Sequence, residues 1–484
     1  MTGHGALEPA RRQLQLQQQL LQQAPQPSAA CPVVLVSGFL GPANEHWCKY
    51  YWGEAIGLNT PESPVILASV SCVGSCHDRA CEIYAQLRGC RVDYGEDHAA
   101  ECGHDRFGRD YTGKGKWPHW DEAHPVHLVG HSFGGNTVRA LRYLLACDFF
   151  GHGTSSAFLR STTTLSAPIK GTLLTYMLGA SEDHDPSRPV RRFSTGYMLG
   201  MGVHLYELVA PRVGLDRFVD LGMDYWRFGE GGLKAFFRSH GSGPEGGGSP
   251  PIRALDNAAH DMTFAAAQEW CERVRRVLDA DPYAFEFNLV AKKAGILTYT
   301  IQKARERLMP EGRLVSLPSL IYNSILVCRD LWVSLGASSV NSSDFGLVIQ
   351  DKGKQRVDDH LVGESDGLCS SAAQFESDLV LGIGEAQRLA QHNQLRPGQY
   401  TIPLPDKHDH FSIVPFPDEA ADQHTFFADL FAMLRSLPQP DYRRDRARPQ
   451  RSEPISVASA SGPSRESLHA KVGAFALWWV DIRR

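Results

Sequence analysis

The sequence contains no long hydrophobic run. No stretch of its 484 residues approaches the roughly 20 apolar residues that a membrane-spanning helix needs. The first 30 residues lack the charged and then apolar pattern of a secretory signal, and they carry a glutamine-rich run from Gln13 to Gln23. We therefore expect no transmembrane segment and a disordered, Gln-rich leader over residues 1–30. The compartment stays open, with an intracellular location favoured and an extracellular one as the alternative.

Positive charge is not in excess either. The net charge is -5, and no basic stripe with interleaved aromatic residues precedes the carboxyl-terminal tail. This balance argues against a nucleic-acid partner. The proportions of hydrophobic residues, 42%, and charged residues, 21%, are typical of a soluble globular enzyme. We find no internal repeat, and the length suits either one large domain with insertions or two ordinary domains.

Cysteine, in contrast, is abundant. The chain has 11 cysteines, and seven of them lie before residue 103. Such a cluster is compatible with disulfides, with metal ligation, or with small buried apolar side chains. We favour the buried side chains, which leaves the redox compartment undecided.

Short β-branched runs alternate with helical patterns along most of the chain. The run at 126–129 stops at a glycine, and residues 136–145 then place their apolar side chains on one helical face. Alternation of this kind predicts an α/β fold with a mostly parallel central sheet flanked by helices. The other expected strands lie at 32–36, 64–68, 161–165, 283–290 and 346–350.

Two segments have the composition of loops. Residues 241–251 are nearly all Gly, Ser and Pro, which predicts a flexible surface insertion. Residues 438–484 form a tail rich in Arg, Ser and Pro. We therefore expect the catalytic domain to occupy residues 31–437.

The strongest motif is the pentapeptide Gly130-His131-Ser132-Phe133-Gly134. It stands between an apolar strand and an amphipathic helix, the setting of a nucleophile elbow in which a serine occupies a strained turn. Glycines flank such a serine because larger side chains would clash there. We predict that Ser132 is the nucleophile of an ester hydrolase.

A serine nucleophile needs a histidine base and an acid that orients it, in the chain order Ser, acid, His. Among the downstream acids only Asp366 lies in a turn at the start of a new element; Asp351, Asp358 and Asp359 are weaker choices. His410 stands at a loop end before an apolar run. The local pattern alone leaves His408 and His424 open.

Two backbone amides are expected to bind the oxyanion of the tetrahedral intermediate. Phe133 follows the nucleophile directly and supplies the first amide. The loop Ser37-Gly38-Phe39, directly after the first strand, is placed to supply the second through Phe39.

Beyond the pentapeptide, the sequence resembles the thermoalkalophilic Bacillus-type true lipases. The likeness runs through Lys49-Tyr50-Tyr51-Trp52-Gly53, the stretch 78–87, the stretch 92–98 and the stretch 103–109, and it is weaker towards residue 437. The resemblance implies the α/β-hydrolase fold of a divergent lipase. It also implies the triad Ser132, Asp366 and His410.

The resemblance further implies a structural zinc in an insertion at about 70–115. The matching ligands are Asp78, His98, His104 and Asp261, with Asp256 as a nearby competitor for the last position. Two carboxylates and two imidazoles suit a closed tetrahedral zinc site. Cys76 and Cys102 are softer ligands that could compete.

Two departures from the family pattern leave the oxyanion amides in place. The family's His-Gly-Phe loop reads Ser37-Gly38-Phe39, and the usual glutamine after the nucleophile is Phe133. The family's calcium site is not supported. Its glutamate is replaced by Ser412, and Asp418 aligns only loosely with its next acid, so we predict no calcium.

An unusually apolar segment at about 193–228 corresponds to the lid of these lipases. The alternative for this segment is a plain core helix. The leading hypothesis is a lipase that acts on acylglycerol esters at a lipid–water interface through an acyl-enzyme. The rivals are an esterase, thioesterase or acyltransferase with the same triad, and an inactive lipid-binding protein of the same fold.

Overall fold

The computed structural model describes a large part of the chain. The described residues are 31–180, 190, 194–228, 255–281, 285–291, 366, 369, 371–374, 376–377, 379–405, 408, 410, 414 and 420–438. The expected strand at 346–350, the insertion 241–251, the leader 1–30 and the tail after residue 438 lie outside them.

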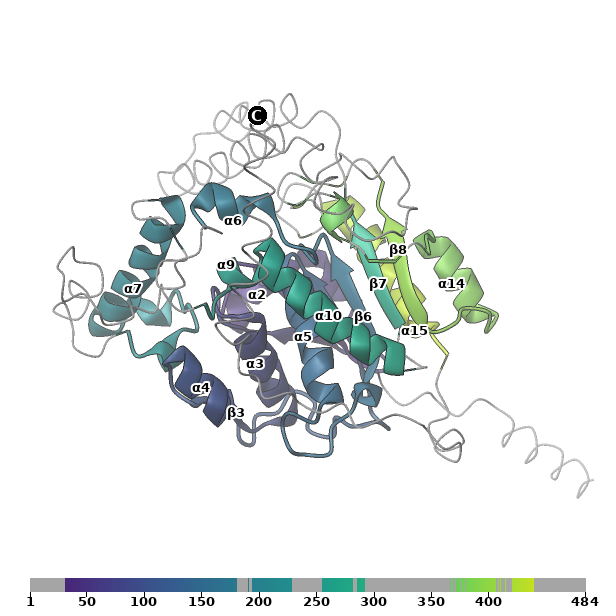
Figure 1. Cartoon of the computed structure of the whole chain (residues 1–484). Coiled ribbons are helices and arrows are strands. Elements are labelled where there is room, and N and C mark those ends of the chain that lie inside the picture. Colours follow the sequence, from purple (N-terminus) through teal and green to yellow (C-terminus); the bar gives the residue numbers. More distant parts are fainter. Residues whose placement is uncertain are drawn as a thin grey trace, which may run out of the picture.

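The core of the fold is a six-stranded parallel sheet in the order β2-β1-β5-β6-β7-β8 (Figure 1). Its strands are β1 (Val33–Val36), β2 (Val65–Ala68), β5 (Val126–His131), β6 (Leu159–Leu165), β7 (Phe285–Val290) and β8 (Gly398–Pro403). The prediction of a mostly parallel sheet is confirmed, and β1, β2, β5, β6 and β7 match five of the expected strands. Strand β8 was not predicted. It begins with Gly398 and ends with Pro403, residues that are uncommon inside strands and are tolerated here at a sheet edge.

Helices cover both faces of this sheet. The side chains of β1 alternate: Val34 and Val36 pack in one core with α3 (Cys76–Arg88) and α5 (Phe133–Ala146). Val33 and Leu35 pack on the other face with α15 (Ala420–Arg435). Helix α10 (Phe264–Ala280) lies beside α5, and the second face is completed by α2 (Glu45–Trp52), η1 (Gly53–Leu58) and α14 (Ile383–Gln391) (Figure 1).

A small substructure lies at one end of the molecule, beside α3 (Figure 1). It consists of the antiparallel strands β3 (Arg91–Asp93) and β4 (Phe107–Asp110) with α4 (Glu96–Cys102) between them. The expected insertion 70–115 also contains α3, which packs on the main sheet. The remaining elements are η2 (Ser156–Phe158), α6 (Leu173–Leu178), α7 (Thr195–Val213), η3 (Leu215–Arg217), η4 (Asp224–Trp226), α9 (Ala258–Asp261) and η6 (Ser371–Gln374).

The described cysteines all have free thiols. Six of the ten are buried, namely Cys48, Cys72, Cys76, Cys81, Cys271 and Cys369. This burial agrees with their interpretation as small apolar side chains. Among the described helices, none is both long enough and apolar enough to cross a membrane.

Candidate active site

The pentapeptide forms a sharp turn between β5 and α5. Ser132 has φ 55° and ψ -132°, a strained conformation for a residue with a side chain. A Cβ on Gly130 would lie 2.2 Å from the carbonyl oxygen of Gly134, and one on Gly134 would lie 2.3 Å from that of Val36. These contacts explain the two flanking glycines. The turn presents Ser132 at the carboxyl end of the sheet, where it is partly exposed.

The structure brings Ser132, His410 and Asp366 together from distant parts of the chain. The hydroxyl of Ser132 lies 2.9 Å from His410 Nε2, to which it donates. On the other side of the ring, His410 Nδ1–H donates to Asp366 Oδ2, also at 2.9 Å. Both distances are within hydrogen-bond range, and His410 and Asp366 are both buried. The arrangement is a complete relay from hydroxyl to imidazole to carboxylate.

Asp366 is held by several further contacts. Its Oδ1 accepts from the Cys369 amide at 2.8 Å, and its Oδ2 accepts from Gln374 Nε2 at 3.1 Å. The backbone amide of His410 donates to the carbonyl oxygen of Asp366 at 2.9 Å. Gln374 also binds Ala291 directly after β7, where its Oε1 accepts the Ala291 amide at 3.0 Å. Gln374 was not predicted, because it is a lone glutamine in a segment without a recognised motif.

Both predicted oxyanion amides belong to residues that border Ser132. Phe133 is the first residue of α5, so its amide has no acceptor four residues earlier. Phe39 follows Gly38, which packs directly on Ser132: a Cβ on Gly38 would lie 2.7 Å from Ser132 Cβ. Only glycine fits at that position. The loop that carries Phe39 and the first residue of α5 thus both adjoin Ser132.

A second hydrogen-bond chain connects this loop with His410. The Gly38 amide donates to Tyr51 Oη at 3.0 Å, and the Tyr51 hydroxyl donates to His131 Nδ1 at 2.5 Å. His131 Nε2–H then donates to the carbonyl oxygen of His410 at 2.8 Å. Burial, assisted by the nearby His410, holds the pKa of His131 well below its usual range, so this imidazole stays neutral. Tyr51 and His131 both lie inside motifs noted in the sequence, but their roles were not predicted.

A cluster of potential metal ligands lies between α3, α4 and the segment before α9. Asp78 Oδ1 is 3.1 Å from His98 Nε2 and 3.7 Å from His104 Nε2. Asp256 Oδ2 is 3.5 Å and 3.3 Å from the same two nitrogens. Ligand atoms of a tetrahedral site at about 2.0–2.1 Å from a metal would be about 3.3 Å apart. Three predicted ligands therefore converge with the spacing of such a site.

Asp261, the fourth ligand expected from the sequence, lies apart from this cluster, and Asp256 lies beside the two histidines instead. Asp261 Oδ2 accepts from the Cys76 amide at 2.6 Å, at the amino terminus of α3. There the carboxylate satisfies a free helix-terminal donor and interacts favourably with the helix dipole. Cys102 Sγ lies 3.9 Å from His98 Nδ1, the ring nitrogen opposite the one that faces the carboxylates.

The environment of the cluster suits a cation. His104 Nε2 and Asp256 Oδ2 are buried without a hydrogen-bond partner, which is costly for polar atoms. His104 Nδ1–H donates to Asp105 O at 2.8 Å, and this contact orients the ring so that Nε2 faces the carboxylates of Asp78 and Asp256. Burial and the charge of Asp256 raise the pKa of Asp78 to about 6. The residues present therefore fit a divalent metal.

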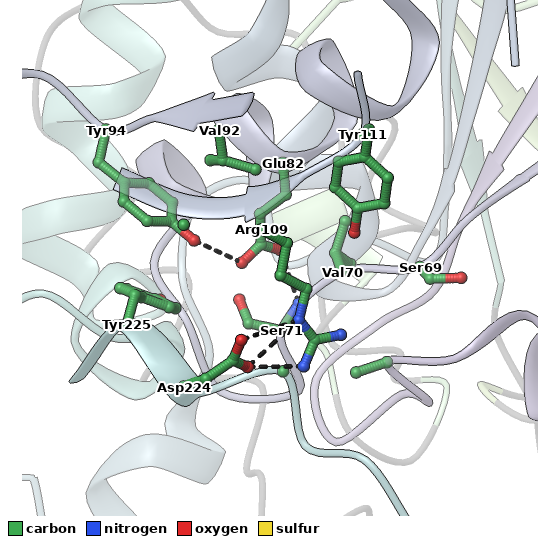
Figure 2. A pocket seen from close by; sticks show the side chains of 13 residues that line it. Ser69, Val70, Ser71, Glu82, Val92, Tyr94, Arg109, Tyr111, Asp224 and Tyr225 are labelled. Atoms are coloured by element: carbon green, nitrogen blue, oxygen red, sulfur yellow. Dashed lines mark hydrogen bonds and ion pairs between the residues drawn. The ribbon is translucent and has the colours of Figure 1, made fainter. Parts of the chain in front are cut away.

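A small polar pocket lies next to this cluster, and Ser132 is not among the residues that line it (Figure 2). Arg109 on β4 borders it and makes paired contacts with Asp220 at 2.7 Å and with Asp224 at 2.6–3.2 Å. Tyr225, beside Asp224, donates to Asp78 Oδ2 at 2.8 Å. The chain after α7 is thereby anchored both to β4 and to the candidate metal cluster.

Comparisons with known proteins agree with this architecture. The family model described as "Lipase-like, C-terminal domain" matches residues 29–183. Lipase 2 of Staphylococcus aureus is 44% identical over 128 residues, which are 25% of this chain and 18% of the relative. The lipase of Staphylococcus hyicus is 32% identical over 228 residues, 41% of this chain and 31% of the relative. The chain thus spans less than a third of the length of these relatives.

Solved structures extend the likeness to the fold of most of the chain. The Staphylococcus hyicus lipase structure has a TM-score of 0.53 at 22% identity and covers 84% of this chain and 96% of its own. Lipase 1 of Pelosinus fermentans has a TM-score of 0.52 at 22% identity and covers 85% and 100%. Together with the parallel sheet and its flanking helices, these likenesses identify the chain as a protein of the α/β-hydrolase fold.

Proposed function

We propose that this protein is a serine lipase that hydrolyses carboxylic esters of the acylglycerol class through an acyl-enzyme. The observation that carries the proposal is the continuous relay Ser132–His410–Asp366, with distances of 2.9 Å at both steps. The match of residues 29–183 to the lipase-like family model and the similarity of part of the chain to staphylococcal lipases support the choice of a lipid ester as substrate.

The first half of the reaction acylates the enzyme. His410 Nε2 takes the proton of Ser132 as the oxygen attacks the ester carbonyl carbon, and Asp366 stabilises the resulting imidazolium through Nδ1–H. The carbonyl oxygen becomes an oxyanion that accepts from the amides of Phe39 and Phe133. His410 then gives its proton to the leaving alkoxide, and the alcohol departs.

The second half regenerates the enzyme. Water loses a proton to His410 while its oxygen attacks the acyl carbon, and the oxyanion forms again at the same two amides. When the tetrahedral species collapses, the bond to Ser132 breaks and His410 returns its proton to the serine oxygen. The products are the carboxylic acid and the free enzyme.

Zinc is the metal that we assign to the cluster of Asp78, His98, His104 and Asp256. When bound, it would supply a structural cross-link, since four protein ligands leave no open position for water or substrate. The residues themselves join α3, α4 and the segment before α9, and Tyr225 connects them to the chain after α7. Calcium is not part of the proposal, and Ser412 and Asp418 lie outside the described residues.

Reaction with a fluorophosphonate probe and a panel of esters tests the activity. We expect stoichiometric labelling of Ser132, because the relay activates its hydroxyl, and turnover of both p-nitrophenyl esters and emulsified triacylglycerols. If Ser132 is labelled but the protein only turns over thioesters or only transfers acyl groups, the protein would instead be a thioesterase or an acyltransferase with the same triad. A chain that neither labels nor turns over any ester would be an inactive lipid-binding scaffold.

The segment that contains α7 is the lid of the proposed lipase. Its helix is apolar on most sides, yet only His204, Leu208 and Ala210 are buried. An apolar stripe faces solvent, formed by Met198, Leu205, Val209 and Val213. An exposed stripe of this kind suits contact with a lipid surface, and the anchoring of Asp220 and Asp224 by Arg109 gives the segment a fixed end.

Aspartate at Leu205 tests the lid. We expect Leu205→Asp to lower activity on emulsified long-chain triacylglycerols about 10- to 100-fold, the cost of losing one apolar side chain from a lipid contact. Activity on a soluble short-chain ester should change less than about twofold, because 42% of the surface of Leu205 is exposed and its replacement disturbs little packing.

Leu379→Asp is the matched control, since Leu379 is similarly exposed and its carbonyl oxygen accepts the Thr401 amide of β8. Strand β8 and helix α7 lie on opposite sides of the molecule (Figure 1). Leu379→Asp should leave both activities unchanged. Equal losses of the two activities in Leu205→Asp would indicate a core helix instead of a lid.

A further inference from the structure

A buried arginine binds the loop that follows β1. None of the surface of Arg79, on α3, is exposed. Its Nη1 donates to the carbonyl oxygen of Gly38 at 3.2 Å, and its Nη2 donates to that of Ser37. Burying a guanidinium is costly unless its donors find acceptors. The acceptors here are two successive carbonyls of the loop beside Ser132.

Binding these carbonyls fixes the directions of the amides that follow them. In a trans peptide the C=O of one residue and the N–H of the next point in opposite directions. With the Ser37 carbonyl on Arg79, the Gly38 N–H points the other way, and there Tyr51 Oη accepts it at 3.0 Å. The Gly38 carbonyl oxygen accepts from Arg79. Because the Gly38 C=O and the Phe39 N–H belong to one trans peptide, the Phe39 N–H points away from the guanidinium.

The Phe39 amide differs from its neighbours. The Leu40 amide donates to Cys72 O at 2.8 Å, and the Gly41 amide donates to Gly38 O at 3.1 Å. For Phe39 N–H, no acceptor is present among the described residues. The loop that carries it packs on the nucleophile, since a Cβ on Gly38 would lie 3.2 Å from Ser132 Oγ. The unused donor is therefore available to a substrate oxygen.

We propose that Arg79 is a positioning residue of the oxyanion hole, which orients the Phe39 amide by binding the carbonyls of Ser37 and Gly38. Tyr51 assists by accepting the intervening Gly38 amide. The guanidinium also lies 5.0 Å from the centre of the Phe133 ring, so one side chain borders both residues that supply oxyanion donors. Arg79 acts through the backbone and does not touch the substrate. The inference rests on the proposed hydrolysis by Ser132.

A purely structural role for Arg79 is the alternative, and the chain offers a matched control. Arg142 on α5 is equally buried, and it donates to Thr162 Oγ1 at 2.8 Å and to Phe285 O at 3.1 Å, away from the loop. Arg79→Lys and Arg142→Lys therefore make the same chemical change at two fully buried sites. Only the first should alter the oxyanion hole.

Steady-state kinetics on a soluble p-nitrophenyl ester provide the first readout. Loss of one oxyanion donor lowers kcat by about 10²- to 10³-fold. Because lysine can hold only part of the arginine contacts, we expect Arg79→Lys to lower kcat by about 10- to 100-fold with little change in KM. Arg142→Lys should retain kcat within about twofold. Tyr51→Phe, which removes only the hydroxyl, should also lower kcat at unchanged KM. This variant provides the test if Arg79→Lys fails to fold.

The second readout is the ³¹P resonance of the diethylphosphoryl adduct at Ser132, whose phosphoryl oxygen occupies the oxyanion hole. Its chemical shift should move in Arg79→Lys and Tyr51→Phe and should stay at the wild-type value in Arg142→Lys. Wild-type kcat and shift in folded Arg79→Lys or Tyr51→Phe would overturn the inference, as would an equal change in Arg142→Lys. If the wild-type protein itself does not react with the phosphorylating agent, the proposed function fails, and the inference with it.

Discussion

Ser132→Ala should abolish ester hydrolysis while the protein stays folded. Without the serine oxygen no acyl-enzyme forms, and the amides of Phe39 and Phe133 alone give limited acceleration. The expected loss in kcat is on the order of 10⁶-fold, as for a triad whose nucleophile is removed. Initial rates on a p-nitrophenyl ester, together with the thermal unfolding midpoint, measure both parts of the result.

The two histidines near the end of the domain supply the control. His410→Ala should lose activity by several orders of magnitude, because His410 Nε2 is the only group described as accepting from Ser132 Oγ. His408→Ala removes another buried imidazole, one that packs against Phe426, and should affect stability more than turnover. Near-wild-type turnover in Ser132→Ala, or a larger loss in His408→Ala than in His410→Ala, would contradict the assignment of the triad.

Asp256→Asn should remove the proposed zinc. The change keeps the shape of the side chain but eliminates the carboxylate charge that faces both His98 and His104. The purified variant should contain less than one tenth of the wild-type zinc by elemental analysis. Its thermal midpoint should fall by roughly 5–10 °C, since a metal that binds only the folded state stabilises by a few kcal/mol. Chelation of the wild-type protein should lower the midpoint similarly.

Asp261→Asn is the comparison that separates the two aspartates. Asp261 accepts from the Cys76 amide at the start of α3, so its variant should keep the metal and lose only a modest amount of stability. If Asp261→Asn lost the zinc and Asp256→Asn kept it fully, the fourth ligand would be Asp261, as expected from the sequence.

Sequence patterns were sufficient to predict the strands and turns that are determined by residues close together in the chain. The run Val33–Val36 could be assigned to a strand because each of its residues is apolar and buried. The elbow around Ser132 could be identified because its glycines are required by contacts within a few residues and with the adjacent β1. The choice of Asp366 and His410 depended mainly on chain order and on the resemblance, because the turn around Asp366 and the loop end at His410 are weak local signals.

Other features depend on contacts between distant segments. Asp256 and Asp261 are both aspartates and lie close together in the sequence. Only the packing of their segment against α3 and α4 places Asp256 in the candidate metal cluster and Asp261 at the Cys76 amide. Gln374 acquires its role from Asp366 and from the end of β7. The contacts of Arg79 with the carbonyls of Ser37 and Gly38 cross more than 40 positions of sequence, and no spacing rule predicts them.

The all-parallel order of the central sheet affects how the chain must fold. Parallel neighbours cannot be joined by a tight hairpin: Val33 pairs with His127, and Phe285 pairs with Gly398. Each pairing closes a long loop before its contacts form, which slows folding and leaves strand edges exposed in intermediates. His410 follows β8 in the chain, so its contact with Ser132 spans the segments that carry β6, β7 and β8. Recovery from denaturant should therefore be slow and concentration-dependent, and enzymatic competence should be among the last properties to return.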